Sequence, residues 1–163
     1  MAIDRNTLFT HLEQLGIEAS TVEHEPVFTV EQSAALRATI PGAHTKSLFL
    51  ADKDGHLVLA VAKDDTRVDM KKLAKQLGLG RLSFGKPELL ESVLGVTPGS
   101  VTPLALLNDT TASVTVVVDE ALMNFGEVNC HPLENTATTR VATGDLLRFI
   151  EATGHTPIIV KLG

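Results

Sequence analysis

The chain has 163 residues, of which 44% are hydrophobic, and its formal net charge is −6. The length and the hydrophobic content fit one folded domain, residues 1–163, and exclude a disordered chain. The negative charge argues against non-specific binding of DNA or RNA over the whole surface.

The first 40 residues predict a helix, a short strand and a second helix. Asp4 is a favourable N-cap for the first helix, and Gly16 is a favourable residue at its end. Thr29 and Gln32 have the spacing of a capping box, which indicates where the second helix begins. The three predicted segments are a helix over residues 5–15, a strand over 21–24 and a helix over 30–37.

The middle of the chain predicts a β-hairpin followed by a helix. Two apolar runs, at residues 47–50 and 57–61, flank a turn-forming sequence at 52–55. Asp69 is a favourable N-cap for the next helix, which closes at Gly78.

The second half of the chain contains helices, strands and a loop rich in Gly and Pro. Pro87 suits the first turn of a helix, and Thr143 is a candidate N-cap for the last helix. The predicted segments are a helix over residues 88–94, the loop 96–103, a β-branched strand over 113–118, short strands within 125–140, a helix over 143–153 and a strand over 157–162.

This order of elements predicts an α/β chain of the mixed, α+β-like kind. Because a hairpin is antiparallel, we expect a central mixed or antiparallel sheet flanked by helices rather than a doubly wound parallel sheet. No linker, repeat or low-complexity segment interrupts the sequence.

Lys46 stands directly before the apolar strand at residues 47–50. An ammonium group at the mouth of a strand can enter a cleft at the sheet edge, where it would hold a phosphate or orient an ester carbonyl. On the local sequence alone, a solvated lysine at the end of a strand is the more ordinary interpretation.

The loop at residues 99–103 is a candidate oxyanion-binding segment. Gly99 allows the backbone to approach a ligand closely, while Pro103 fixes its own φ and restrains Thr102. The amide groups of residues 99–102 can converge on a developing oxyanion or a phosphate. A rigid turn into the following apolar segment explains the same residues, and both interpretations stay open.

The adjacent residues Cys130 and His131 offer a thiol and an imidazole. His131 can act as an acid or a base near neutral pH, although structural histidines are more common. In extended backbone the two side chains point to opposite faces, which favours a buried structural Cys130 over a nucleophile. The His and Cys residues lack the spacing of a zinc site, so we expect no metal and no cofactor.

The cysteine content also bears on the cellular compartment. With Cys130 as the only cysteine, no intrachain disulfide can form, and the reducing cytoplasm is the expected location. The sequence shows no secretory signal and no apolar run of about 20 residues, the length that crosses a bilayer.

Residues 63–86 form a basic segment in this acidic chain, with seven Lys and Arg against three Asp, a local charge of +4. A basic surface formed by this segment can contact phosphates locally, although a solvated helix face is the simpler interpretation of the charges. The candidate phosphate contacts are Arg67, Lys71, Lys72 and Lys75.

Five segments carry a specific combination of motifs: EPVFTVE at residues 25–31, TKSLFL at 45–50, DMKKL at 69–73, GSVTP at 99–103 and HPLENT at 131–136. Together they resemble the YbaK-like editing family, the free-standing relatives of the insertion domain of prolyl-tRNA synthetase. The resemblance spans nearly the whole chain, and it is strongest to the branch of alanine-specific prolyl-tRNA deacylases. Each segment would be a weak signal by itself.

The resemblance implies a YbaK-like fold, with a partly barrel-like sheet, and hydrolysis of mischarged Ala-tRNA(Pro). The implied partners are the acceptor end of tRNA(Pro) and prolyl-tRNA synthetase, with no membrane and no DNA. The implied catalytic residues are Lys46, Gly99, Ser100 and His131. The implied substrate-binding residues are Val30, Thr45, Val101, Thr102 and Pro103.

The resemblance further implies that a terminal tRNA hydroxyl and a water, rather than a protein nucleophile, carry out the hydrolysis. Three alternatives stay open at this point. They are a deacylase for Cys-tRNA(Pro), a non-catalytic module that binds tRNA or a synthetase, and a hydrolase of small amino esters.

Overall fold

The computed structural model describes residues 2–26 and 30–163, apart from the side chains of Val30 and Ser33. The α-helices are α1 (Arg5–Gln14), α2 (Val30–Thr39), α3 (Met70–Leu77), α4 (Pro87–Leu94) and α5 (Thr143–Ala152). The 3-10 helices are η1 (Pro98–Ser100), η2 (Pro103–Asn108) and η3 (Glu120–Asn124). The strands are β1 (Ala19–Glu23), β2 (Ala43–Ala51), β3 (Leu57–Lys63), β4 (Ser83–Phe84), β5 (Val114–Asp119), β6 (Glu127–Cys130), β7 (Ala137–Ala142) and β8 (Ile158–Val160). No described helix has the length and apolar content needed to cross a membrane.

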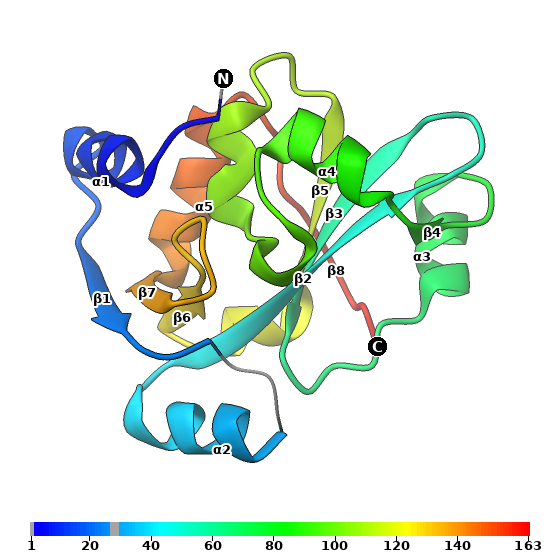
Figure 1. Ribbon diagram of the computed structural model, residues 1–163. Coiled ribbons are helices and arrows are strands. Elements are labelled where there is room, and N and C mark those ends of the chain that lie inside the picture. The colour runs from blue at the N-terminus through cyan, green and yellow to red at the C-terminus, as the bar shows by residue number, and fades with distance from the viewer. Residues whose placement is uncertain (1, 27–29) are drawn as a thin grey trace.

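The described strands form one mixed sheet in the order β1-β7-β6-β2-β3-β5-β8, with β4 paired to β2 (Figure 1). The pairs β1–β7, β7–β6, β2–β3 and β2–β4 are antiparallel. The pairs β2–β6, β3–β5 and β5–β8 are parallel. The expected α/β fold with a mixed central sheet and flanking helices is therefore confirmed.

The strand β2 holds the two halves of the sheet together. Its first residues, Ala43 and His44, pair with β6, whereas residues 45–51 pair with β3 on the opposite edge. Near its end, Leu50 and Ala51 pair with β4. On the edge away from β3, the Phe49 carbonyl accepts from the Gly85 amide next to β4, and the described strands leave residues 45–48 of β2 uncovered, so the sheet is split there.

Two apolar clusters pack on opposite faces of the sheet. The larger cluster joins β2, β3 and β5 to α1, α4, α5 and η2, and it includes Phe49 and Phe149. The smaller cluster includes Leu50 and Leu73 and lies under α3. Because alternate residues of a strand point to opposite faces, β3 is buried on both sides, which explains its continuous apolar run.

The predicted caps of two helices are confirmed. The Asp4 carboxylate accepts a hydrogen bond from the Thr7 amide at 2.8 Å, and the Asp69 carboxylate accepts one from the Lys72 amide at 3.0 Å. Gly78 closes α3 with a left-handed φ of 68°. The predicted capping box at Thr29 lies outside the described residues.

The N-cap predicted at Thr143 is wrong. Ala142 occupies that position and makes no side-chain capping bond. The Thr143 hydroxyl instead donates to the carbonyl oxygen of Phe125 at 2.6 Å, and its amide donates to the Gly126 carbonyl at 3.0 Å. A partner 18 residues away in the chain has thus displaced the local cap.

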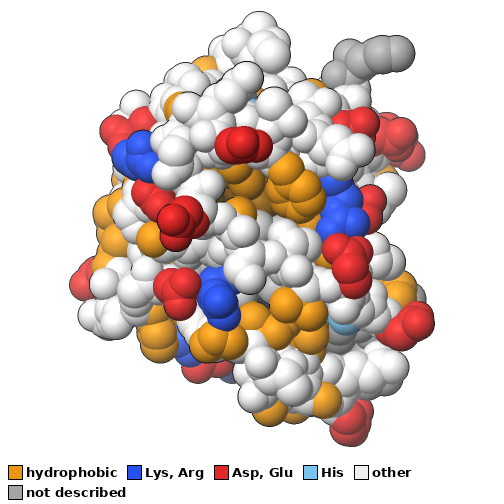
Figure 2. Space-filling model, turned by 90° about the vertical axis from the view of Figure 1, so that its left-hand side faces the viewer, with side chains coloured by type: hydrophobic (Ala, Val, Ile, Leu, Met, Phe, Trp, Pro, Cys, Tyr) orange, Lys and Arg blue, Asp and Glu red, His pale blue; other side chains and the backbone are white. Residues whose placement is uncertain are grey.

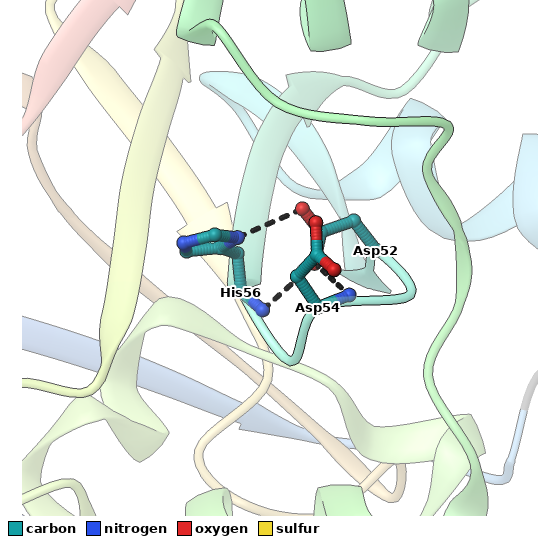
Figure 3. Close-up of side chains that lie close together, drawn as sticks. All are labelled: Asp52, Asp54 and His56. Carbon is teal, nitrogen blue, oxygen red and sulfur yellow. Dashed lines mark hydrogen bonds and ion pairs between the residues drawn. The ribbon is translucent and has the colours of Figure 1, made fainter.

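The hairpin turn between β2 and β3 is closed by the side chain of Asp52 (Figure 3). One carboxylate oxygen accepts from the amides of Asp54 and His56, and the other contacts the His56 ring at 2.8 Å. Burial of the Asp52 carboxyl group raises its pKa, but these hydrogen bonds outweigh burial and hold the pKa below its usual value. The polar turn that the sequence predicted is therefore a specific hydrogen-bonded structure.

A buried polar network ties the end of η2 to the end of α5. The Asp109 carboxylate accepts from the Ser113 hydroxyl and from the amides of Ser113 and Val114. It also contacts the His155 ring at 2.8 Å, and the side chains of Asp109 and His155 are only 3% and 1% exposed. Burial raises the pKa of Asp109, but the bonds from His155, Ser113 and Val114 outweigh it and lower the pKa.

We predict that Asp109→Ala lowers the free energy of unfolding by about 3–5 kcal/mol, since it leaves several buried donors without an acceptor. Because the folded pKa lies below the unfolded value of about 3.9, the contribution of Asp109 is complete above that pH and is lost as the pH falls through the folded pKa. Urea unfolding followed by circular dichroism at pH 7 and pH 3 measures both effects. Asp65→Ala, at a carboxylate that is 70% exposed, is the control, and an equal loss in the two variants would contradict the prediction.

Candidate functional site

A cavity of about 310 Å³ opens beside the start of β2, next to the split in the sheet. Its walls come from α2, β2, the segment after β3, η1, β6, the segment between β6 and β7, and β7. The residues that line it are Leu36, Arg37, His44, Thr45, Asp64, Gly99, Asn129, Cys130, His131, Asn135 and Thr138. Its volume is at the lower end of the range for small-molecule sites.

Three of the residues proposed from the sequence lie together in this cavity: Thr45, Gly99 and His131. The hydroxyl of Thr45 donates to the backbone carbonyl of Asn129 at 2.7 Å, which fixes the side chain against β6. Residues that lie more than 80 positions apart in the chain thus meet at one wall.

The remainder of the loop 99–103 lies behind the cavity. Ser100, Thr102 and Pro103 are buried, and Val101 packs partly buried against the larger apolar cluster. The Ser100 amide donates to the Thr97 carbonyl at 2.9 Å, so it is already engaged. Within the described residues, no acceptor is found for the amides of Gly99, Val101 and Thr102, and of these residues only Gly99 lines the cavity.

Lys46 is not among the described residues that line the cavity. It is half-buried on β2 opposite Ala62. Since neighbouring residues of a strand alternate, its side chain leaves β2 on the face opposite to that of Thr45. No carboxylate partner of the Lys46 ammonium is found in the described part of the chain. The structure therefore does not bring Lys46 together with the other proposed residues.

His131 presents a neutral imidazole to the cavity. Burial lowers its pKa below the ordinary value of 6.5, with the charge of His24 acting in the same direction and the contact with Ala137 acting against it. Its Nδ1 lies 3.4 Å from the Ala137 carbonyl oxygen, which can only accept. We therefore assign the ring proton to Nδ1, which leaves Nε2 as an acceptor that no described residue engages.

Cys130 lines the cavity, and its surroundings disfavour the reactive thiolate. Burial raises the pKa of its thiol to about 12, and the neighbouring Thr45 hydroxyl lowers it only in part. At neutral pH the reactive thiolate is therefore almost absent. This agrees with the structural role that the sequence favoured.

Sequence reasoning missed several cavity residues, of which Asn129 is the most constrained. Its amide nitrogen donates to the carbonyls of Pro41 and Ala43 at 2.9 and 3.3 Å, which fixes the orientation of the side chain. Its Oδ1 is buried and has no hydrogen-bond partner among the described residues. Nothing in the local sequence singles out this residue, because its role depends on a segment 86 to 88 positions earlier.

Two charged residues at the cavity were also missed. Arg37 is in the last turn of α2, and Asp64 directly follows β3. A polar residue immediately after a buried strand is the only sequence signal that could have pointed to Asp64.

The proposed phosphate contacts lie elsewhere, on and before α3. Arg67, Lys71 and Lys75 are exposed, and Lys71 and Lys75 border a groove of about 740 Å³ together with Arg81. Lys72 is different, because its ammonium donates to the Gly163 carbonyl at 2.9 Å. The helix α3 covers the face of the sheet opposite to the larger apolar cluster.

Other hollows and polar groups contain none of the proposed residues. Figure 2 shows the side of the molecule on which α1 and β1 lie, where hydrophobic side chains gather between acidic and basic ones. A cavity of about 450 Å³ is lined there by residues of α1, of the segment that leads into β1, and of β1 itself, and Glu13 and Glu18 are its titratable groups among the described residues.

In the part of the chain that the structure describes, Asp52, Asp54 and His56 are the group whose ligand atoms lie close enough for a metal ion, within 4.8 Å (Figure 3). Both carboxylate oxygens of Asp52 already accept hydrogen bonds inside the turn. We therefore assign this group to the closure of the hairpin.

The sequence is similar to known proteins of translation. A family model described as "Aminoacyl-tRNA editing domain" matches residues 24–149. A zebrafish (Danio rerio) protein named prolyl-tRNA synthetase associated domain-containing protein 1 is 40% identical over 159 residues, which cover 96% of this chain and 86% of that protein. The prolyl-tRNA editing protein ProX of Acetoanaerobium sticklandii is 35% identical, with 97% of each chain covered.

The fold also matches a solved structure. A protein provisionally described as a trans-editing enzyme for prolyl tRNA synthetase superimposes with a TM-score of 0.74. The alignment covers 100% of this chain and 99% of the other, with 23% sequence identity. At this identity the likeness establishes the shared fold.

We predict that the Cys130 thiol of the native protein reacts with a disulfide reagent such as DTNB at least about 1000-fold more slowly than the thiol of the urea-unfolded chain at pH 7.5. The raised pKa leaves about a thousandth of the ordinary thiolate fraction, and burial blocks access. As the chain has one cysteine, the absorbance change reports this site alone. Comparable rates in the two states would contradict the assignment.

Proposed function

The chain belongs to the aminoacyl-tRNA editing domain family, and we propose that it hydrolyses the ester bond of tRNA(Pro) that carries a wrong amino acid. The specific substrate is Ala-tRNA(Pro), and the active unit is a single domain, residues 1–163. The observation that carries this proposal is the similarity of nearly the whole chain to a prolyl-tRNA editing protein. The proposed location of this activity is the cytoplasm, and the proposed protein partner is prolyl-tRNA synthetase.

The proposed reaction takes place beside Thr45, Gly99 and His131. A water attacks the ester carbonyl, and Nε2 of His131 accepts a proton from that water, directly or through the terminal ribose hydroxyl of the tRNA. The tetrahedral intermediate then collapses with cleavage of the ester C–O bond, and His131 returns the proton to the leaving ribose oxygen. The amide of Gly99, which lines the cavity, donates to the oxyanion. Val101 and Thr102 support this loop from behind the cavity. The buried thiol of Cys130 supports this scheme, because its raised pKa makes it a poor nucleophile for a covalent mechanism.

Size is the proposed basis of selectivity. A synthetase pocket made for proline cannot strongly reject the smaller alanine, so a second site that accepts only small side chains is needed. A cavity of about 310 Å³ with Leu36 in its wall supports such a site. Val30 remains a proposed part of the wall, although its side chain lies outside the described residues.

The tRNA itself is proposed to bind outside the cavity. Lys46 holds a phosphate of the acceptor end, a role supported by its lack of a carboxylate partner among the described residues. Arg67, Lys71 and Lys75 contact the acceptor stem, a role supported by their exposure in an acidic chain. Lys72 contributes as well if its contact with Gly163 opens, and Ser100 supports the loop from its buried position.

The deacylation assay that tests this proposal compares Ala-tRNA(Pro), Cys-tRNA(Pro), Pro-tRNA(Pro) and a free alanine ester. We expect rapid release of alanine from tRNA(Pro), and slow or no release from the other three, because the site needs both a small side chain and the tRNA.

Lys46→Ala should slow the reaction at least about tenfold through loss of one charged contact. Preferred release of cysteine would identify a Cys-tRNA(Pro) deacylase, and tRNA binding without turnover would identify a binding module.

We predict that kcat/KM falls at acid pH, because His131 accepts a proton only when its ring is neutral. The inflection should lie below 6.5, because burial lowers the pKa of this ring. His131→Asn should reduce kcat/KM and remove this inflection. The measurement is a pH–rate profile on Ala-tRNA(Pro) between pH 5 and 8. A profile that keeps the same inflection in the variant would show that another group titrates.

A further inference from the structure

Arg37 and Asp64 face each other at the cavity, from α2 on one side and from the end of β3 on the other. The guanidinium Nη1 lies 2.7 Å from Asp64 Oδ2, and the two side chains are 40% and 19% exposed. Among the described residues that line the cavity, Asp64 is the only carboxylate and Arg37 the only guanidinium. The cavity therefore has one positively and one negatively charged side chain next to each other.

An aminoacyl-tRNA carries the complementary pair of charges around its ester. The α-ammonium group is attached to the carbon next to the ester carbonyl, and the phosphate of the terminal nucleotide lies on the ribose side. An enzyme that positions this ester gains from a carboxylate for the ammonium and a guanidinium for the phosphate, which it can bind through two parallel hydrogen bonds.

We propose that the Arg37–Asp64 pair exchanges partners when substrate binds, so that Asp64 holds the α-ammonium group and Arg37 holds the terminal phosphate. This inference rests on the function proposed above. Asp64 then determines specificity, because a substrate whose amino group is acylated offers no positive charge to Asp64. The substrate class is thus aminoacyl-tRNA with a free amino group, and peptidyl-tRNA is excluded.

The contacts around the pair make the exchange feasible. Arg37 is 40% exposed, so water can replace Asp64 as the partner of its guanidinium when the pair opens. The backbone amide of Asp64 donates to the His44 carbonyl at 2.9 Å, which holds the residue in place at the end of β3. The neighbouring ammonium of Lys63 lies 3.9 Å from Asp64 but 2.8 Å from Asp65, so it leaves the Asp64 carboxylate available.

The first test compares hydrolysis of Ala-tRNA(Pro) and N-acetyl-Ala-tRNA(Pro) by the full-length protein under single-turnover conditions. We expect the wild type to prefer the free amino group at least about tenfold, as is typical of a hydrogen-bonded charge. Asp64→Asn should abolish most of this preference by slowing only the unblocked substrate, and Asp64→Glu should restore part of it. Asp65→Asn, the exposed neighbouring carboxylate, is the matched control and should keep the preference.

The outcomes separate this inference from the function on which it rests. Equal rates on both esters in the wild type, or an unchanged preference in Asp64→Asn, would overturn the role of Asp64 while the editing function stands. Absence of turnover on every aminoacyl-tRNA would overturn the editing function and this inference together. A purely structural ion pair would lower stability in Asp64→Asn without changing the preference between the two esters.

The second test addresses Arg37 through salt dependence. Arg37→Gln should reduce kcat/KM and make the slope of log kcat/KM against log salt less steep by about 0.7, the value for one lost phosphate contact on a single strand. It should keep the preference for a free amino group. Arg148→Gln is the matched control, because Arg148 is 53% exposed, pairs with Asp145 and does not line the cavity. An unchanged slope in Arg37→Gln would overturn the phosphate contact.

Discussion

The short parallel pairing between the start of β2 and β6 is the constraint on which the site depends. Only Ala43 and His44 of β2 take part in this pairing, yet it joins the two halves of the sheet. The side chain of Asn129 strengthens the junction through its bonds to the carbonyls of Pro41 and Ala43. The Thr45 hydroxyl adds a bond to the Asn129 backbone. The cavity exists because these contacts hold α2, β2 and β6 around a break in the sheet.

The distribution of charge in the cavity follows from this construction. The inner wall contains buried Cys130 at the end of β6 and half-buried His131 directly after it, and desolvation favours the neutral form of both side chains. The charged groups, Arg37 and Asp64, come from segments at the outer side, where water still reaches them. In the proposed reaction, this arrangement would keep the ester next to neutral side chains and the charged groups of the substrate next to Arg37 and Asp64.

The fold was predictable from the sequence where local patterns decide the structure. The caps at Asp4 and Asp69 and the hairpin around residues 52–55 each follow from a few adjacent residues, and all are present. The N-cap at Thr143 was wrong because the hydroxyl found a partner at Phe125, which no local pattern reveals. The same limit applies to the site: the motifs pointed to Thr45, Gly99 and His131. Arg37, Asp64 and Asn129 entered only once distant segments were seen together.

The hydrogen bond between Thr45 and Asn129 spans 84 positions of the chain, which has a consequence for the order of folding. The β2–β3 hairpin and α3 are made from residues close in sequence, so they can form early and at little entropic cost. The contact of β2 with β6 must wait until the loop of more than 80 residues between them has closed. During synthesis from the N-terminus, the wall formed by β6 cannot be added until residues near 129 have left the ribosome. The growing chain therefore carries an incomplete cavity through most of its synthesis.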